Sequence, residues 1–284
     1  MASRYFTPLR YPGGKAKLSW LIKDIIKENN LEGAQYIEPF AGGAAVALEL
    51  LLTRAVSHIH INDLNIGVHS FWYSVLHDTE RLMKKIYDTP VTMKTWYEQR
   101  DIMRQPSCAS TTEIGFAFFF LNRTNRSGII NAGVIGGYEQ TGNYKIDARF
   151  NKDDLIERIT SIAKAKDSIS LYNLDAEKFL SEIDRRNFDL AISYIDPPYF
   201  VKGKRLYDNF YEGDDHKRIG KLLKKLKTPW VLSYDDHPEI RSIYSEHRIS
   251  EIDLAYSAAN KTKGQEAIFF SHDLNLPSTL LHEH

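Results

Sequence analysis

The chain has 284 residues, 43% of them hydrophobic, and its 37 Lys and Arg balance 37 Asp and Glu, giving a formal net charge of zero. This length predicts one large α/β domain with an insertion, or two modest domains. Because the net charge is zero, a surface that binds nucleic acid would require positive and negative residues to be separated locally. No apolar run is long enough for a signal peptide or a membrane span, so we expect a cytoplasmic protein without membrane contact.

A β-α-β unit is predicted in the first quarter of the chain. Apolar residues recur at helical spacing after a glycine turn, and two short strands flank a second, Ala- and Leu-rich helix. The elements are a turn at 11–15, a helix from 18, a strand at 36–37, a small-residue turn at 38–43, a helix at 44–52 and a strand at 59–61. Parallel sheets are built from such units, so this pattern favours an α/β fold.

The middle of the chain has a different pattern. Residues 67–104 show helical periodicity, and the aromatic run at 114–121 is typical of a buried helix. Glycines and basic residues are scattered through 122–150. Because no parallel-strand pattern appears here, we interpret 66–165 as an inserted domain and assign 1–65 and 166–284 to the main domain.

The strand pattern returns in the last part of the chain. Two strands end in carboxylates, Asp175 and Asp196, and the final two strands are expected to form a hairpin at the edge of the sheet. Predicted strands lie at 168–172, 188–195, 230–234, 249–254 and 266–270, with helices after 175 and at 215–226.

The Asp-Pro-Pro-Tyr block at 196–199 is the strongest local signal for chemistry. Two prolines fix the backbone and bring a carboxylate, carbonyl oxygens and an aromatic ring together. Asp196 and the Pro197 carbonyl could accept hydrogen bonds from an exocyclic amino group, while Tyr199 stacks on a base that has left the duplex. The alternative is a rigid turn in which Tyr199 packs as an ordinary core residue.

The turn after the first strand indicates a nucleotide-like cofactor. Gly42 allows close approach of the backbone, and Asp63 follows 21 residues later, near the spacing at which Rossmann-type units present a carboxylate to ribose. The complete Gly-x-Gly-x-x-Gly fingerprint of NAD-binding proteins is absent. A surface turn is the alternative reading of Asp63.

Several motifs, in this order, resemble those of the Dam-like, or D12 class, adenine-specific DNA methyltransferases. They are LRYPGGK at 9–15, IEPFAGGAAVAL at 37–48, INDLN at 61–65, LNRTNRSGI at 121–129 and YIDPPY at 194–199. The resemblance implies a Rossmann-like S-adenosylmethionine-dependent methyltransferase fold with a mostly parallel seven-stranded sheet and an inserted, mainly helical DNA-recognition domain. Ala44 departs from the family pattern, which more often has glycine there, but adds only a methyl group.

The resemblance also implies roles for individual residues. Cofactor-binding residues would be Tyr11, Lys15, Glu38, Pro39, Phe40, Gly42, Asp63, Asp175 and Asp196, and catalytic residues would be Asp196, Pro197, Pro198 and Tyr199. Lys15 would lie near the methionine carboxylate of S-adenosylmethionine, with Gly13 and Gly14 shaping its loop.

The region 66–165 would hold the DNA-recognition residues. Arginines suit phosphates or guanine edges and asparagines suit adenine edges, although the asparagines could instead tie down the glycine-rich loop. The candidates for DNA contact are Asn122, Arg123, Asn125 and Arg126, together with Lys202, Lys204 and Arg205 after the catalytic block. The segment 260–264 resembles a family hairpin near the cleft.

The predicted function is site-specific N6 methylation of a flipped adenine in double-stranded DNA, without a required metal, by a monomer in a bacterial, archaeal or phage-infected cell. Pairing with a restriction endonuclease is one of its expected biological settings. Methylation of an amino group in cytosine or RNA is an alternative activity, and a catalytically silent DNA-binding homologue is an alternative of a different class.

Overall fold

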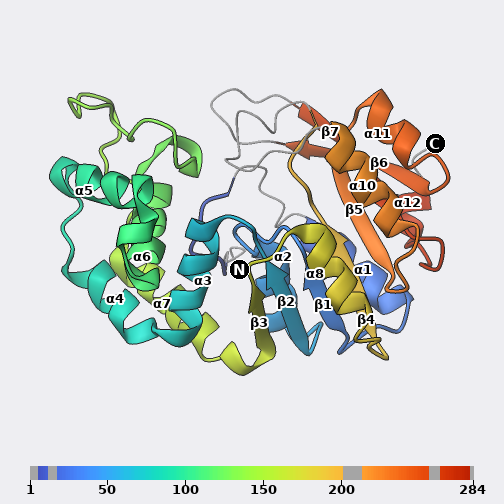
Figure 1. Cartoon of the computed structure of the whole chain (residues 1–284). Helices are drawn as coiled ribbons and strands as arrows, with labels where there is room; N and C mark the ends of the chain where they lie inside the picture. Colours follow the sequence, from blue (N-terminus) through green and yellow to red (C-terminus); the bar gives the residue numbers. More distant parts are fainter. Residues whose placement is uncertain (1–5, 12–17, 201–212, 256–262, 282–284) are drawn as a thin grey trace. The chain divides into compact units, whose positions relative to one another are not determined.

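The computed structural model describes residues 6–11, 18–200, 213–255 and 263–281. The predicted sites at Gly13, Gly14, Lys15, Lys202, Lys204 and Arg205, and the segment 260–262, lie outside these described residues. Two compact units are present (Figure 1): a helical unit of Met1–Pro12 with Asn65–Asp167, and a sheet unit of Gly13–Leu64 with Ser168–His284. No described helix has the length and apolar character needed to cross a lipid bilayer.

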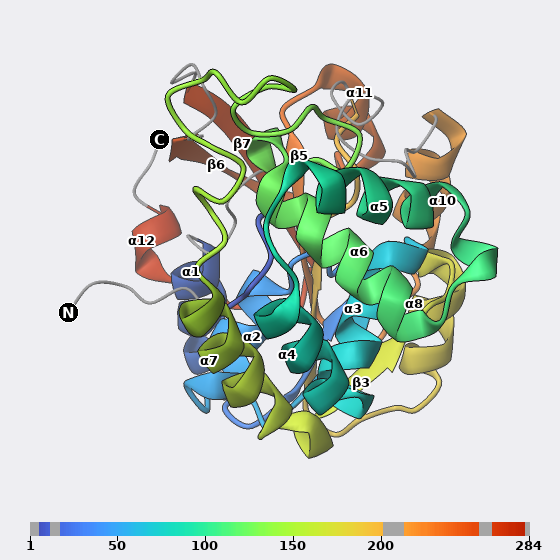
Figure 2. The same ribbon diagram turned by 90° about the vertical axis from the view of Figure 1, so that its left-hand side faces the viewer.

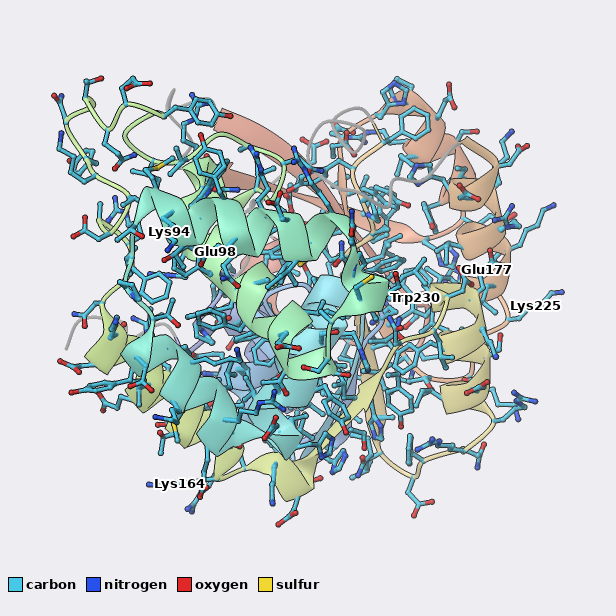
Figure 3. All side chains as sticks on the ribbon, turned by 60° about the vertical axis from the view of Figure 1, so that its left-hand side comes forward. Lys94, Glu98, Lys164, Glu177, Lys225 and Trp230 are labelled. Carbon is cyan, nitrogen blue, oxygen red and sulfur yellow. The ribbon has the colours of Figure 1, made fainter. Side chains whose placement is uncertain are left out.

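The helical unit is built around α6, which spans Thr111–Thr124 (Figure 2). Ser110 caps its first turn through a capping box with Glu113, and the helix is apolar around most of its circumference, which favours burial on all sides. The other helices of this unit are α3 (Ile66–His77), α4 (Thr79–Asp88), α5 (Met93–Arg104) and α7 (Lys152–Ala163), with short 3-10 turns at Pro106–Cys108, Arg126–Gly128 and Lys166–Ser168. The outer face of α5 carries the exposed side chains of Lys94 and Glu98 (Figure 3).

Small residues allow α3 and α6 to pack closely. A Cβ atom added at Gly115 of α6 would lie 2.5 Å from the carbonyl oxygen of Ser70 in α3. The rings of Phe71 and Phe119 stack beside this contact, with centroids 5.3 Å apart. The aromatic run that the sequence predicted as a buried helix is therefore the core of the helical unit.

The N-terminal segment belongs to the helical unit, whereas the sequence analysis placed residues 1–65 in the main domain. The side chain of Asn122 accepts a hydrogen bond from the backbone N–H of Arg10 at 2.8 Å and donates to its carbonyl at 2.7 Å. Gly128 lies against the same residue, where an added Cβ would come within 2.9 Å of the Arg10 Cβ. Contacts across more than a hundred residues thus fix this segment, and no local sequence pattern signals them.

The sheet unit contains seven strands in the order β3-β2-β1-β4-β5-β7-β6. The first five are parallel, and β7 runs antiparallel to β5 and β6. Their bounds are β1 Gln35–Glu38, β2 His58–Asn62, β3 Ile169–Tyr172, β4 Ala191–Ile195, β5 Trp230–Asp235, β6 Arg248–Ala255 and β7 Lys263–Phe270. The predicted α/β class, the mostly parallel sheet and the hairpin at its edge are confirmed.

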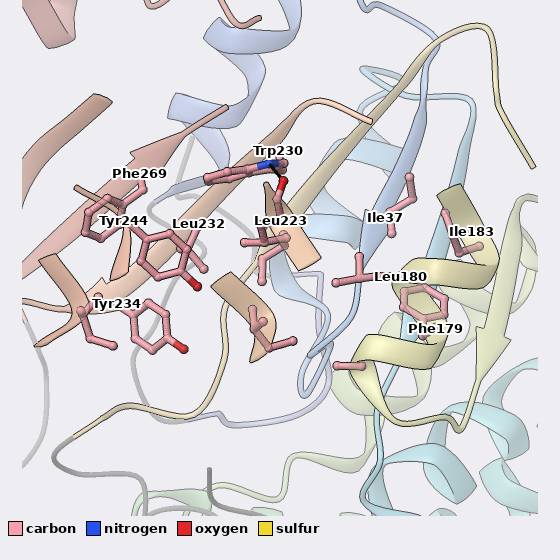
Figure 4. Close-up of a cluster of buried hydrophobic side chains, with 14 of the residues drawn as sticks. Ile37, Phe179, Leu180, Ile183, Leu223, Trp230, Leu232, Tyr234, Tyr244 and Phe269 are labelled. Carbon is pink, nitrogen blue, oxygen red and sulfur yellow. Dashed lines mark hydrogen bonds between the residues drawn. The ribbon is translucent and has the colours of Figure 1, made fainter. Parts of the chain in front are cut away.

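One face of this sheet is covered by α8 (Ala176–Asp184), α10 (Gly213–Leu223) and α11 (Pro238–Ile243) (Figure 1). Figure 4 shows the core between them, where Phe179 and Leu180 of α8 and Tyr244 after α11 lie in one cluster of buried side chains. The indole N–H of Trp230 donates to the carbonyl of Leu223 at 3.1 Å, so this large ring is buried without an unpaired donor. This core fixes the strands whose ends carry the candidate site.

The opposite face of the sheet carries α2 (Ala45–Leu52), which packs against α1 (Ser19–Glu28). Side chains alternate between faces along a strand. Ile37 belongs to the core beneath α8, and its neighbour Glu38 accepts a hydrogen bond from the Ala47 N–H of α2 at 3.2 Å. Strands β2 and β3 follow β1 on one side of the sheet, and β5 follows β4 on the other side. The switch point, where α/β sheets bind ligands, therefore lies between β1 and β4. The remaining short helix, α12, spans Ser278–Leu281.

Candidate active site in the sheet unit

Carboxylates mark the carboxyl ends of all five parallel strands. Glu38 and Asp235 end β1 and β5, Asp63 and Asp196 directly follow β2 and β4, and Asp175 comes three residues after β3. Since parallel strands end at one edge of the sheet, this edge is strongly acidic. Such an edge attracts cationic ligands and repels phosphates.

Glu38 is the most deeply buried of these carboxylates, with 4% of its surface exposed. Burial raises its pKa well above the ordinary value, and the nearby charge of Asp196 raises it further, whereas the Tyr36 hydroxyl and the Ala47 N–H act in the opposite direction. Asp63 adds a smaller contribution that also raises the pKa. Two carboxyl groups at the switch point are therefore electrostatically coupled.

The turn between β1 and α2 is held by Asp63. The Gly42 N–H donates to Asp63 Oδ2 at 2.8 Å, and Gly42 has a φ of +44° that favours glycine. Ala44, which caps α2, also has a left-handed backbone, with φ +47° and ψ +34°. The spacing of 21 residues noted in the sequence thus corresponds to a direct contact between turn and carboxylate.

Asn62, the last residue of β2, links the loops that follow β1 and β3, a role that its sequence position did not reveal. Its amide donates to the Pro39 carbonyl at 2.9 Å and to the Leu174 carbonyl at 3.0 Å, and accepts from the Leu174 N–H at 2.9 Å. Only 1% of its surface is exposed. A polar residue at the end of the predicted strand, directly before Asp63, was the available signal.

The Asp-Pro-Pro-Tyr turn is anchored to β5. Ser233 Oγ donates to Asp196 Oδ1 at 3.2 Å and lies 2.9 Å from the Tyr194 hydroxyl. Because the serine hydrogen is directed to the carboxylate, the tyrosine hydroxyl is the donor in the second bond. The Phe200 N–H donates to Asp235 Oδ1 at 2.8 Å at the other end of the turn. Ser233 thus orients the Asp196 carboxylate, and Asp235 fixes the backbone at the end of the turn.

Tyr199 is tied to the antiparallel edge of the sheet. Its hydroxyl donates to Oε1 of the buried Glu266 at 2.9 Å, and 6% of its surface is exposed. Glu266 and Ser233 were missed because their contacts cross 67 and 37 residues of sequence. The hydroxyl contact is a structural function, and stacking of the ring on a base stays a prediction.

The remaining cofactor candidates occupy different places. Pro39 is buried beside Asn62, and the half-buried Phe40 packs against the core beneath α8. Asp175 caps α8, accepting from the Glu177 and Lys178 N–H groups at 2.9 and 3.4 Å. Tyr11 lies in the N-terminal segment of the helical unit.

The DNA-binding candidates of the helical unit have mainly backbone partners. Asn122 is 1% exposed and holds Arg10, while Asn125 accepts from the Trp96 indole at 2.7 Å and donates to the Ile129 and Ile130 carbonyls. This geometry supports the role in tying down the loop that the sequence left open. Arg123 donates to the Arg149 carbonyl at 2.7 Å, and Arg126 is exposed.

The acidic edge fits S-adenosylmethionine, which carries a sulfonium and an ammonium group. Asp63, Gly42 and the buried Glu38 form a turn at the position where α/β folds bind nucleotide-like cofactors, and Asp196 lies across the switch point on β4. The described residues contain no group of three His, Cys, Asp or Glu side chains arranged to hold a metal ion.

This fold and site define a Rossmann-like, S-adenosylmethionine-dependent methyltransferase. The chain belongs to the D12 class N6 adenine-specific DNA methyltransferase family, whose model matches residues 11–258. It therefore methylates the N6 amino group of adenine in DNA, with S-adenosylmethionine as the methyl donor.

The chain is similar in sequence to one methyltransferase and, more distantly, in structure to two others. The Type II methyltransferase M.MjaIII of Methanocaldococcus jannaschii is 26% identical over 239 residues, which cover 77% of this chain and 79% of that protein. A putative class I S-adenosylmethionine-dependent methyltransferase from Listeria monocytogenes has a TM-score of 0.38 at 10% identity, covering 92% of this chain and 60% of its own. The rRNA methyltransferase aviRa from Streptomyces viridochromogenes has a TM-score of 0.41 at 10% identity, and the match covers 92% of this chain and 85% of the aviRa chain.

Proposed function

We propose that the chain methylates an adenine that has been flipped out of double-stranded DNA, and that Asp196 and the Pro197 carbonyl accept hydrogen bonds from its amino group. The observation that carries this assignment is the fixed orientation of Asp196 by Ser233 at the carboxyl end of β4. Pro198 stiffens the turn, and Tyr199 contacts the base through its ring.

When bound, S-adenosylmethionine supplies an electrophilic methyl group on sulfur. Asp196 directs the nitrogen lone pair of the adenine amino group by accepting a hydrogen bond from one of its N–H groups. The carboxylate need not be a strong base, because the proton leaves after the nitrogen has become positively charged. Tyr11, Lys15, Glu38, Pro39, Phe40, Gly42, Asp63, Asp175 and Asp196 form the proposed cofactor set.

The decisive experiment compares Asp196→Ala with Asp189→Ala, since Asp189 is exposed just before β4, at the other end of the same strand. Protein is incubated with labelled S-adenosylmethionine and duplex DNA, and the nucleosides are analysed by mass spectrometry. We expect N6-methyldeoxyadenosine from wild type and Asp189→Ala, and a loss of about 100-fold or more in Asp196→Ala, whose cofactor binding is weakened but still measurable. Full transfer by Asp196→Ala would refute the catalytic assignment.

The proposal assigns DNA recognition to the insert at 66–165 and a monomeric state to the enzyme. The acidic edge of the sheet unit supports this division, because it is unsuited to contacts with DNA phosphates. Exchanging the insert for that of a homologue should change the methylated sequence without changing the modified atom. Sedimentation in the presence and absence of duplex DNA tests the oligomeric state.

The name of the Methanocaldococcus relative, a Type II methyltransferase, supports a setting in restriction-modification, in which a nuclease cuts the same sequence. Expression in a host without adenine methylation, followed by mapping of modified bases, should show one short target sequence. Plasmid from that host should resist a nuclease specific for this sequence, and methylation spread over unrelated sequences would contradict the proposal.

A further inference from the structure

Four arginines from distant parts of the sequence meet in the helical unit. Arg10 lies in the N-terminal segment, Arg123 near the end of α6, Arg149 in the loop before α7, and Arg158 in α7. Arg123 Nε donates to the Arg149 carbonyl at 2.7 Å, and Arg158 donates to the Thr7 carbonyl at 3.1 Å. We call these four residues the arginine cluster.

Backbone carbonyls, rather than carboxylates, are the main partners of the cluster. Arg10 Nη1 donates to the Asn125 carbonyl at 3.0 Å, and Arg123 Nη1 donates to the Pro8 carbonyl at 3.4 Å. Carbonyl groups satisfy guanidinium hydrogens but carry no net charge. Asp154 forms an ion pair with Arg158 at 2.9 Å, and its charge raises the pKa of Arg123, against the effect of burial.

The cluster is electrostatically unfavourable without an external anion. Burial lowers the pKa of Arg123 to about 10, with further lowering by Arg10 and Arg158, and burial followed by the charge of Arg149 lowers the pKa of Arg10. Guanidinium groups carry a positive charge at neutral pH, so like charges are held together in a partly desolvated place.

We propose that the arginine cluster binds a phosphate group of the DNA backbone. Arg10 is half-buried and Arg149 is exposed, so their guanidinium groups are the ones open to an incoming phosphate. A guanidinium group matches phosphate oxygens with two parallel N–H donors. In this arrangement Asn122 is a positioning residue, because its amide holds both backbone groups of Arg10.

The distribution of charge along the chain agrees with this assignment, which rests on the proposed role of the insert in DNA binding. Residues 1–12 and 65–167 contain 16 Lys and Arg against 12 Asp and Glu, and the rest of the chain has 21 against 25. The net charge of zero therefore combines a basic helical unit with an acidic sheet unit.

The test measures DNA affinity against salt concentration by fluorescence anisotropy for wild type, Arg149→Met and Arg10→Met. Lys164→Met is the matched control, because Lys164 is exposed at the far end of α7 and its loss changes the charge of the unit equally (Figure 3). Each arginine variant should weaken binding to target and scrambled duplexes by the same factor. Each should also reduce the slope of log K against log salt by about 0.9, the value for one phosphate contact, whereas Lys164→Met keeps the wild-type slope.

Arg149→Lys should retain the slope, because it retains the charge, and thermal melting of each variant identifies any loss of folding. Unchanged slopes in both Met variants, or weakening confined to the target duplex, would overturn the phosphate assignment while leaving the proposed function intact. Absence of DNA binding by the wild-type protein would overturn both.

Discussion

Ala44 occupies a backbone conformation that L-amino acids rarely adopt, with φ +47° in the turn that leads into α2. Its side chain is fully buried, and its position is the one at which the family more often has glycine. The strain of a left-handed alanine, about 1 kcal/mol or more, is offset by the buried methyl group and by the smaller entropy loss of alanine on folding. The near balance of these contributions explains why alanine is accepted here.

Substitution of this residue should reveal that balance. We expect Ala44→Gly to change the free energy of unfolding by less than about 1 kcal/mol. Ala44→Val should lower it by about 2–4 kcal/mol, because a β-branched residue is strained in this conformation and overfills a buried site. Chemical denaturation measures both, and a valine variant as stable as wild type would show that the turn can adopt another backbone.

The buried Glu38 carboxyl should make stability fall as pH rises. Its pKa is raised in the folded state, so between the unfolded value near 4.5 and the raised value the folded protein holds more protons than the unfolded chain. Glu38→Gln lacks this ionisation and retains an acceptor for the Ala47 N–H. The free energy of unfolding of wild type relative to Glu38→Gln should therefore decrease in urea titrations as the pH rises above the unfolded value of about 4.5. Parallel pH profiles would show that Glu38 does not titrate abnormally.

Loops, rather than helices and strands, carry most of the site, and single buried polar residues fix them. Asn62, at the end of β2, joins the loops after β1 and β3 through three hydrogen bonds. Asn62→Ala would leave buried backbone groups at Pro39 and Leu174 without these partners. We expect a loss of about 2–4 kcal/mol in stability and weaker S-adenosylmethionine binding, measured by denaturation and calorimetry. Wild-type affinity in a folded variant would show that the loops are held by other contacts.

Tyr199 combines a buried hydroxyl contact with the proposed base contact of its ring. Tyr199→Phe removes the bond to Glu266 and keeps the ring, so stability should fall by about 1–3 kcal/mol while methyl transfer is largely retained. Tyr199→Leu removes both and should lose more transfer activity. Equal activity in the two variants, measured as product formed on the same duplex, would assign a purely structural role to the ring.

The strands and their terminal carboxylates could be predicted from the sequence, because alternating apolar residues and a following acid are local patterns. Asp63 and Asp196 were found in this way, and both lie at strand ends. Asn62, Ser233 and Glu266 could not be assigned roles, since their partners are 112, 37 and 67 residues away. A hydrogen bond between distant residues leaves no periodic signal in the chain.

At the scale of the whole molecule, the N-terminal segment and the insert form one unit, although the 52 residues of Gly13–Leu64, which belong to the sheet unit, separate them in sequence. Deleting residues 1–10 should therefore impair the helical unit rather than the sheet unit. We expect the affinity for S-adenosylmethionine to stay within about threefold of wild type, which corresponds to about 0.6 kcal/mol of binding free energy. The affinity for DNA should fall clearly. Calorimetry measures the affinity for S-adenosylmethionine, and fluorescence anisotropy measures the affinity for DNA. Unchanged DNA affinity would show that Arg10 is dispensable for DNA binding.

The position of Arg10 also has a consequence for biosynthesis. Arg10 emerges from the ribosome early, but its partners Asn122, Asn125 and Gly128 are synthesised more than a hundred residues later. Strand β4, which pairs with β1, is synthesised later still. The nascent chain can therefore complete the helical unit before the central strands of the sheet have met. An affinity tag fused to the N-terminus would be carried into the first of these assembly steps, whereas a C-terminal tag would follow the last strands made.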